Sequence, residues 1–525
     1  MMTTNHEDLI GYKFMLAFDG RTPPPRILDW IANRSLGGFT LFRPFNYDSP
    51  RQVRELTAVL QQAARDSGQA PMLIATDQEG GQLAAMGEGT TQFAGNMALG
   101  ATRDAELARR VGRAIGRELA AMGVNVNYAP VLDLNTNPRN PSLGIRAFSD
   151  DPTLTAVLGA AFIEGLQSAG VAATIKHFPG KGEAAVDSHY KMPVIAHDRA
   201  RLEAVEFPPF KAGIEAGAKL MMTGHFAIPA LTGTSAYPAT VARRVMTDFA
   251  RGDMGFEGVI ITDALDMGAI TQGAGQIIDV IAAVRAGVDL MLNKDDPDTQ
   301  ERLYAGLHLA HTRELIDDAH LRASVARILS LKEWAGSQPQ PDLDQVGCAE
   351  HRALEAELAR RSITLVRDTA GLLPLRLPDG ARIAAIMPHP EDLTPADTSS
   401  TIVPHLAAAL RAYRPHVDEF VTEHRPLRET IAILRERVTD YDLLVLGTIN
   451  ASMQPEQAEL ATELLRLGIP TVTVAMRTPY DLAVYPASTT HLCTYSIQPA
   501  SLDALAAAIF GEFTPSGRLP VNVVE

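Results

Sequence analysis

The sequence predicts an α/β protein made of a TIM (β/α)8 barrel followed by a smaller α/β sandwich domain. Short apolar segments alternate with longer amphipathic ones through the first two-thirds of the chain, an order typical of buried parallel strands joined by helices. Eight such apolar segments occur there, which is the strand number of a TIM barrel. A Pro- and Gln-rich stretch then precedes a second alternation. We therefore predict a barrel over residues 1–335, a linker over 336–351 and a sandwich domain over 352–525.

Each predicted strand is a short, mostly apolar run. In the barrel these runs are 12–18, 38–42, 71–76, 124–129, 171–176, 218–223, 258–262 and 287–292. Residues 104–122, 154–170 and 204–217 carry helical patterns, and two prolines near the start of the last one obscure where it begins. In the second domain the predicted strands are 382–387, 441–448, 469–476 and 491–496.

Charge and cysteine content restrict the class of partner. The formal net charge is -15, which disfavours nucleic acid and anionic membrane surfaces. Cys348 and Cys493 are too far apart in sequence to suggest a disulfide framework or a zinc motif. No signal-peptide pattern opens the sequence and no window is apolar enough to span a membrane, so we expect a cytoplasmic protein. The oligomeric state cannot be read from the sequence.

Polar residues follow all eight predicted barrel strands. In chain order they are Asp19, Arg43, Asp77, Asp133, Lys176 with His177, His225, Asp263 and Asn293. One polar residue in a loop means little, but barrel enzymes carry their chemistry at the C-terminal ends of the strands. A complete set around one mouth therefore indicates an active site.

Three residues suggest the chemistry of that site. Asp263 directly follows a buried strand, and a carboxylate held stiffly there can attack the anomeric carbon of a sugar or stabilise positive charge on it. A second group must protonate the leaving oxygen, and this is usually another carboxyl. The loop "KHFPGKGEAAVDSHYKMP" (176–193) offers His189 as an alternative acid, with Asp187 two residues earlier to orient its ring. Glycines in this loop allow the "DSH" part to move.

The motifs "DQEGG", "APVLDLN", "KHFPGKG", "DSH" and "VIITDALDMGAI" together resemble glycoside hydrolase family 3, in particular its bacterial two-domain β-N-acetylglucosaminidase (β-hexosaminidase) branch. The His-Asp pair in the "DSH" loop is the specific part of the resemblance, because β-glucosidases of the family take a glutamate from elsewhere. The segments "RSITLVRDTAGLLPL" and "GEFTPSGRLPVNV" are similar to the second domain of the family.

The resemblance implies a retaining exo-β-N-acetylglucosaminidase that hydrolyses terminal β-linked N-acetylhexosamine and serves in cell-wall (muropeptide) recycling. Asp263 would be the nucleophile, His189 the general acid and then base, and Asp187 its partner. The substrate-binding residues would be Asp77, Arg146, Lys176, His177 and His225. Asp133 would be a structural carboxylate at the pocket floor. No metal and no cofactor are expected.

Three positions depart from the pattern of the family. Gln82 and Ala85 stand where it has arginines, and Lys181 stands where it has a histidine. Three alternatives therefore stay open: a β-glucosidase activity, phosphorolysis in place of hydrolysis, and a barrel that binds sugar without cleaving it. For the second domain we predict a packing or orienting role, with Arg477 and Asp481 in a structural turn.

Overall fold

The computed structural model of the protein describes residues 6–294 and 296–523. Eight parallel strands form one sheet in the order β10-β1-β2-β3-β6-β7-β8-β9. They are β1 (Phe14–Leu16), β2 (Gly38–Thr40), β3 (Leu73–Thr76), β6 (Val126–Asn127), β7 (Ala172–Phe178), β8 (Leu220–Thr223), β9 (Val259–Thr262) and β10 (Met291–Asn293). A parallel bridge between Ile261 and Leu290 joins the two edges, so the barrel is nearly closed. The eight predicted strands are confirmed.

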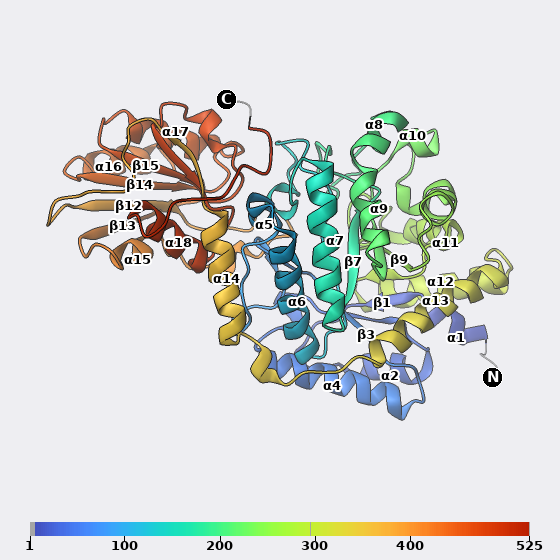
Figure 1. Cartoon of the computed structure of the whole chain (residues 1–525). Coiled ribbons are helices and arrows are strands. Elements are labelled where there is room, and N and C mark those ends of the chain that lie inside the picture. Colours follow the sequence, from blue (N-terminus) through green and yellow to red (C-terminus); the bar gives the residue numbers. More distant parts are fainter. Residues whose placement is uncertain (1–5, 295, 524–525) are drawn as a thin grey trace.

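Helices surround this barrel (Figure 1). The longer ones are α2 (Pro25–Asn33), α4 (Pro50–Asp66), α6 (Ala105–Ala121), α7 (Pro152–Ser168), α9 (Phe207–Glu215), α11 (Gln276–Ala286), α12 (Pro297–Thr312) and α13 (Asp318–Gly336). Short helices are α1 (His6–Gly11), α3 (Arg43–Asn46), α5 (Asn96–Thr102), α8 (Arg199–Ala204) and α10 (Pro229–Thr232), and a small hairpin pairs β4 (Gln78–Gly80) with β5 (Leu83–Ala84).

Side-chain caps explain where two of the predicted helices begin. The Asp104 carboxylate accepts hydrogen bonds from the first free N–H groups of α6, and Asp151 does the same for α7. The predicted helix over 204–217 is divided instead: α8 ends at Ala204 and α9 begins at Phe207. The two prolines that follow Phe207 occupy the first turn of α9, where a missing N–H group does no harm.

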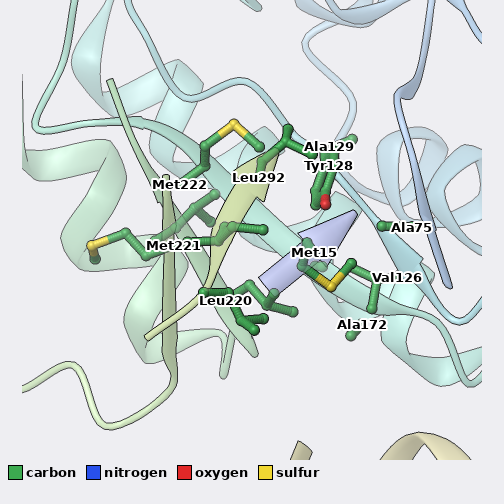
Figure 2. Packing of buried hydrophobic residues seen from close by; sticks show 14 of the residues in the cluster. Met15, Ala75, Val126, Tyr128, Ala129, Ala172, Leu220, Met221, Met222 and Leu292 are labelled. Carbon is green, nitrogen blue, oxygen red and sulfur yellow. The ribbon is translucent and has the colours of Figure 1, made fainter. Parts of the chain in front are cut away.

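Side chains fill the inside of the barrel. Figure 2 shows Met15 of β1, Val126 of β6, Leu220 and Met222 of β8, and Leu292 of β10 converging on one apolar cluster, and each is at most 3% exposed. A barrel core packed in this way leaves no internal channel. Space for a ligand must therefore lie beyond the strand ends.

The second unit contains a six-stranded sheet in the order β11-β16-β15-β14-β12-β13, in which β11 alone runs antiparallel to its neighbour. Its strands are β11 (Thr364–Asp368), β12 (Ile383–Pro388), β13 (Val417–Thr422), β14 (Leu443–Thr448), β15 (Thr471–Ala475) and β16 (Thr490–Cys493). Its helices are α15 (Leu406–Arg411), α16 (Arg428–Arg437), α17 (Pro455–Leu465) and α18 (Pro499–Ile509). Separate apolar clusters cover the two faces of this sheet, which confirms the α/β sandwich.

Helix α14 (Ala349–Ser362) lies between the two units (Figure 1). It packs on α5 and α6 of the barrel and on α18 of the sandwich. At its start, His351 Nδ1 lies 2.9 Å from a carboxylate oxygen of Glu118, and this oxygen also accepts a hydrogen bond from Gly347 N. Across the described ranges, no helix has both the length and the apolar character needed to cross a membrane.

Candidate active site

A cavity of about 380 Å³ opens at the C-terminal ends of the barrel strands. The predicted site residues that line it are Asp77, Arg146, Lys176, His177, His189 and Asp263. Arg43 of the strand-end set lines it too, whereas Asp19 and Asn293 do not. The structure thus brings together side chains that are spread over more than 180 positions of sequence, as the strand-end argument predicts.

Asp263 follows β9 directly and is held by its own backbone. Its N–H group donates to Thr223 O at 3.0 Å, and its Oδ1 accepts from Ala264 N at 2.8 Å. Burial alone would raise the pKa of the carboxyl, but the positive charge of Lys181 and the nearby histidines outweigh burial, and the pKa lies below its usual value. Asp263 is therefore an ionised carboxylate fixed at the cavity wall.

His189 and Asp187 form the predicted pair. Asp187 Oδ1 lies 2.7 Å from His189 Nδ1 and also accepts a hydrogen bond from His189 N at 3.0 Å. Burial opposes ionisation of Asp187, but its hydrogen bonds to the histidine lower the pKa of its carboxyl. An ionised aspartate at Nδ1 leaves the other ring nitrogen to exchange protons with a substrate.

Backbone contacts attach this pair to the segment that follows Asp263. Gly268 N donates to His189 O at 2.8 Å, and Ala269 N donates to Ser188 O at 3.2 Å. The loop that was predicted to move is thus hydrogen-bonded to the segment after the nucleophile candidate, which keeps His189 on the same cavity as Asp263.

Arg146 and Lys176 share Glu79 as a buried counter-ion, a residue absent from the sequence-based predictions. Arg146 binds both carboxylate oxygens of Glu79 at 2.9 and 2.8 Å. Lys176 Nζ lies 2.6 Å from Glu79 Oε1 and 2.6 Å from Asp77 Oδ1. Burial would raise the pKa of Glu79, but the charges of Arg146 and Lys176 lower it to about 2. The only signal in the sequence is the place of Glu79 in "DQEGG", two residues after Asp77.

Asp133 organises the floor of the cavity. Its carboxylate accepts hydrogen bonds from His177 N at 3.1 Å and Lys181 N at 2.7 Å, and it lies 2.6 Å from His177 Nδ1. Burial and the charge of Lys181 hold the pKa of His177 well below its usual value. The ring is therefore neutral with its proton on Nδ1, and Nε2, which is 3.9 Å from Asp263 Oδ2, can accept a hydrogen bond from a sugar hydroxyl.

Comparison with known proteins decides the family. The profile of the "Glycosyl hydrolase family 3 N terminal domain" matches residues 19–331 of this 525-residue chain. The chain belongs to glycoside hydrolase family 3. It is 32% identical to "Beta-hexosaminidase A" of Pseudoalteromonas piscicida over 96% of this chain and 92% of that protein.

Two further relatives cover most of the chain. A "Beta-N-acetylglucosaminidase/beta-glucosidase" of Cellulomonas fimi is 30% identical over 86% of this chain and 84% of that protein. The solved structure of a glycoside hydrolase family 3 β-N-acetylglucosaminidase from Paenibacillus sp. superimposes with a TM-score of 0.94 at 32% identity, over 99% of both chains. The protein is thus a glycoside hydrolase with the two-unit fold of its relatives.

His225 lies outside the cavity of this family 3 hydrolase. The residue is fully buried, with Nδ1 2.8 Å from Thr240 Oγ1 and Nε2 3.2 Å from Ala264 O. Burial lowers the pKa of its ring. As seen from the cavity, His225 therefore lies behind Asp263, where it supports the backbone next to that carboxylate.

The second unit contributes one wall of the cavity, which adds to the packing or orienting role that the sequence predicts for it. The wall is formed by residues 392 and 394–398, which lie in the loop that follows β12. No catalytic motif marks this loop in the sequence. It reaches the barrel mouth because two side chains from other segments hold it there.

Gln82 and Arg477 are those two side chains. Gln82 Nε2 donates to Ala396 O at 3.2 Å, and Gln82 Oε1 accepts from Arg477 Nε at 3.3 Å. Arg477 also pairs with Asp397 at 2.5 Å, and both side chains are almost completely buried. Thr398 N donates to Gln82 O at 2.8 Å. Gln82, a departure from the pattern of the family, therefore joins barrel and wall.

Proposed function

We propose that this family 3 hydrolase is a retaining exo-β-N-acetylglucosaminidase that releases terminal β-linked N-acetylhexosamine through a glycosyl-enzyme intermediate. The observation that carries the proposal is the Asp187–His189 pair on the same cavity as the ionised Asp263. These groups supply a nucleophile and a proton donor, which a double displacement at an anomeric carbon requires.

In the first step, an oxygen of Asp263 forms a bond to the anomeric carbon as the bond to the leaving oxygen breaks. His189 gives that oxygen its proton, and Asp187 balances the charge of the imidazolium before the transfer. In the second step, a water oxygen attacks the anomeric carbon, His189 takes the proton of the water, and the bond to Asp263 breaks. The sugar leaves with its original anomeric configuration.

The printed names of the relatives support the choice of sugar. "Beta-hexosaminidase A" and the family 3 β-N-acetylglucosaminidase of Paenibacillus sp. both point to N-acetylhexosamine. The Cellulomonas fimi relative carries β-glucosidase in its name as well, so glucosides belong in the test. A panel of p-nitrophenyl β-glycosides is expected to show the highest kcat/KM for the N-acetylglucosaminide.

The decisive variant is Asp263→Ala. We expect it to lose p-nitrophenol release from the aryl N-acetylglucosaminide, and Asp253→Ala, which removes an exposed barrel carboxylate, to keep wild-type turnover. Proton NMR of the first product is expected to show the β-anomer. Full turnover by Asp263→Ala, or an α-anomer as first product, would contradict the mechanism.

Phosphorolysis is the second candidate, and the type of acid/base group favours it. A neutral histidine repels an incoming phosphate less than a carboxylate does. Wild-type protein is assayed with and without inorganic phosphate, and the product is identified. Free sugar as the sole product in both conditions supports hydrolysis, whereas sugar 1-phosphate indicates phosphorolysis.

The proposal extends to a cytoplasmic role in recycling muropeptide sugars, which the motif resemblance implies. Both cysteines are free thiols, in keeping with a reducing compartment. A strain that lacks the gene is expected to accumulate cytoplasmic muropeptides that retain N-acetylglucosamine. An unchanged muropeptide pool would remove this part of the proposal.

A further inference from the structure

Lys181 is a cation of the cavity to which the steps above give no part. Lys181 is 2% exposed, yet its side chain lines the cavity together with Asp263, His177 and His189. No residue in the described ranges forms a hydrogen bond or an ion pair with its ammonium group. An ammonium group has three hydrogen-bond donors. Lys181 Nζ is not among the fully buried polar atoms that lack a partner in the described residues, so these donors face the cavity and are open to a ligand.

Its backbone shows why the side chain lies where it does. Lys181 N donates to Asp133 Oδ1 at 2.7 Å, and Lys181 O accepts from Asn140 Nδ2 at 3.0 Å. The Asp133 carboxylate already receives two backbone N–H donors and the His177 ring. The charge of Lys181 also favours the ionised form of this carboxylate, but no hydrogen bond or ion pair within the described residues joins the ammonium group to it.

The other lysines of the cavity differ from Lys181 in this respect. Lys176 is paired with Asp77 and Glu79, and Lys294 lies 3.2 Å from Asp266. Among the described residues Lys181 has no such ion pair. Burial and the charge of Arg146 lower the pKa of its amine, and the charges of Asp263, Asp133 and Asp187 oppose that shift. After burial, Lys181 exerts the strongest effect on the pKa of Asp263 and keeps that carboxylate charged.

We propose that Lys181 contacts the substrate: its ammonium group donates hydrogen bonds to oxygens of the bound sugar beside the anomeric carbon and balances the charge of Asp263. The inference rests on the proposed function, because it assigns a further binding group to the same site. The free donors of Lys181 find acceptors when a sugar enters the cavity. In the second step the same cation stabilises the carboxylate of Asp263 as it leaves the anomeric carbon.

Lys181→Met tests this assignment, because methionine has a similar length and no charge. Binding of N-acetylglucosamine is measured by calorimetry, and kcat/KM for the aryl N-acetylglucosaminide is measured against pH. Loss of a charged hydrogen-bond donor is expected to weaken binding about 10- to 100-fold. In the pH profile, the fall of kcat/KM on the acid side is expected to move to higher pH. Asp263 must be ionised to act, and it loses the cation that lowers its pKa. Lys191→Met, at an exposed lysine of the same loop, is the matched control and is expected to match wild type in both measurements.

Chemical rescue separates charge from fold. Lys181→Cys is prepared in a Cys348→Ser background, so that the half-buried cysteine does not react. With 2-bromoethylamine, the thiolate displaces bromide and the new thioether carries an ammonium group close to the original position. We expect the alkylated protein to regain sugar binding. Bromoethane, which adds an ethyl group without charge, is expected to restore none.

The results distinguish this inference from the proposed function. Wild-type sugar affinity and an unmoved acid limb in Lys181→Met overturn the inference. If that variant does not fold, absence of rescue by aminoethylation overturns it instead. If wild type binds N-acetylglucosamine through Lys181 but releases no p-nitrophenol, the proposed function fails and the binding role of Lys181 stands.

Discussion

Gln82→Ala provides a test of the wall that the second unit supplies. The substitution removes the acceptor of Arg477 Nε and the donor to Ala396 O, while the backbone carbonyl that accepts from Thr398 stays in place. Gln82 is 6% exposed, so water does not readily replace these two bonds. A buried polar group that loses its partner costs about 1–3 kcal/mol, and two such groups therefore cost about 2–4 kcal/mol once partial relaxation is allowed.

This cost falls mainly on the position of residues 392–398, since no hydrogen bond within the described residues joins Gln82 to Asp187 or His189. A tenfold rise in KM requires only about 1.4 kcal/mol of it. We expect KM for a β-linked N-acetylglucosamine disaccharide to rise at least about tenfold, with a smaller change in kcat. Amide hydrogen exchange at Thr398 is expected to become faster. The hydrogen bond from Thr398 N to Gln82 O remains, but it breaks more often once the side-chain bonds of Gln82 are lost.

Gln92→Ala is the matched control for this prediction. Gln92 belongs to the same region of the barrel, and its amide donates to Met86 O and Gly87 O without reaching the second unit. We expect it to lower thermal stability without changing KM. Equal KM values for wild type and Gln82→Ala, with unchanged exchange at Thr398, would refute the claim that Gln82 positions the wall.

Three other changes test the charges of the site and of the core. Asp187→Asn keeps an acceptor for the histidine but cannot balance the imidazolium, so kcat/KM is expected to fall about 10- to 100-fold in steady-state assays without loss of the fold seen by circular dichroism. Glu79→Gln leaves two buried cations without their shared carboxylate, and urea denaturation is expected to show a loss of about 3–5 kcal/mol. Burial lowers the pKa of Lys332 to about 7, below its unfolded value of 10.5, so the folded state binds fewer protons than the unfolded state between these values. Stability in urea is therefore expected to rise as pH increases from about 7 towards 10, and to rise less in Lys332→Met.

The barrel and the Asp187–His189 pair could be predicted from the sequence because both depend on local patterns. Buried parallel strands are continuous apolar runs, so all eight could be located. Asp263 stands out because it ends such a run, and Asp187 with His189 because they are two residues apart. Each of these signals is contained in a few consecutive residues.

What the sequence did not reveal depends on contacts between distant segments. Glu79 acts through Arg146 and Lys176, and nothing in its neighbourhood indicates these partners. The wall residues are held at the cavity by contacts that include Gln82 and Arg477, which are 395 positions apart. Strand β13 was missed for another reason: it lies at the edge of its sheet and exposes Asp418, Glu419 and Val421, so it lacks the apolar run of a central strand.

The shared wall has a consequence for the energetics of the whole molecule. A sugar in the cavity touches a surface that belongs partly to the barrel and partly to the loop after β12. Ligand binding is therefore thermodynamically linked to the association of the two units, because separated units cannot offer the complete surface. A bound sugar is therefore expected to stabilise the sandwich as well as the barrel against unfolding.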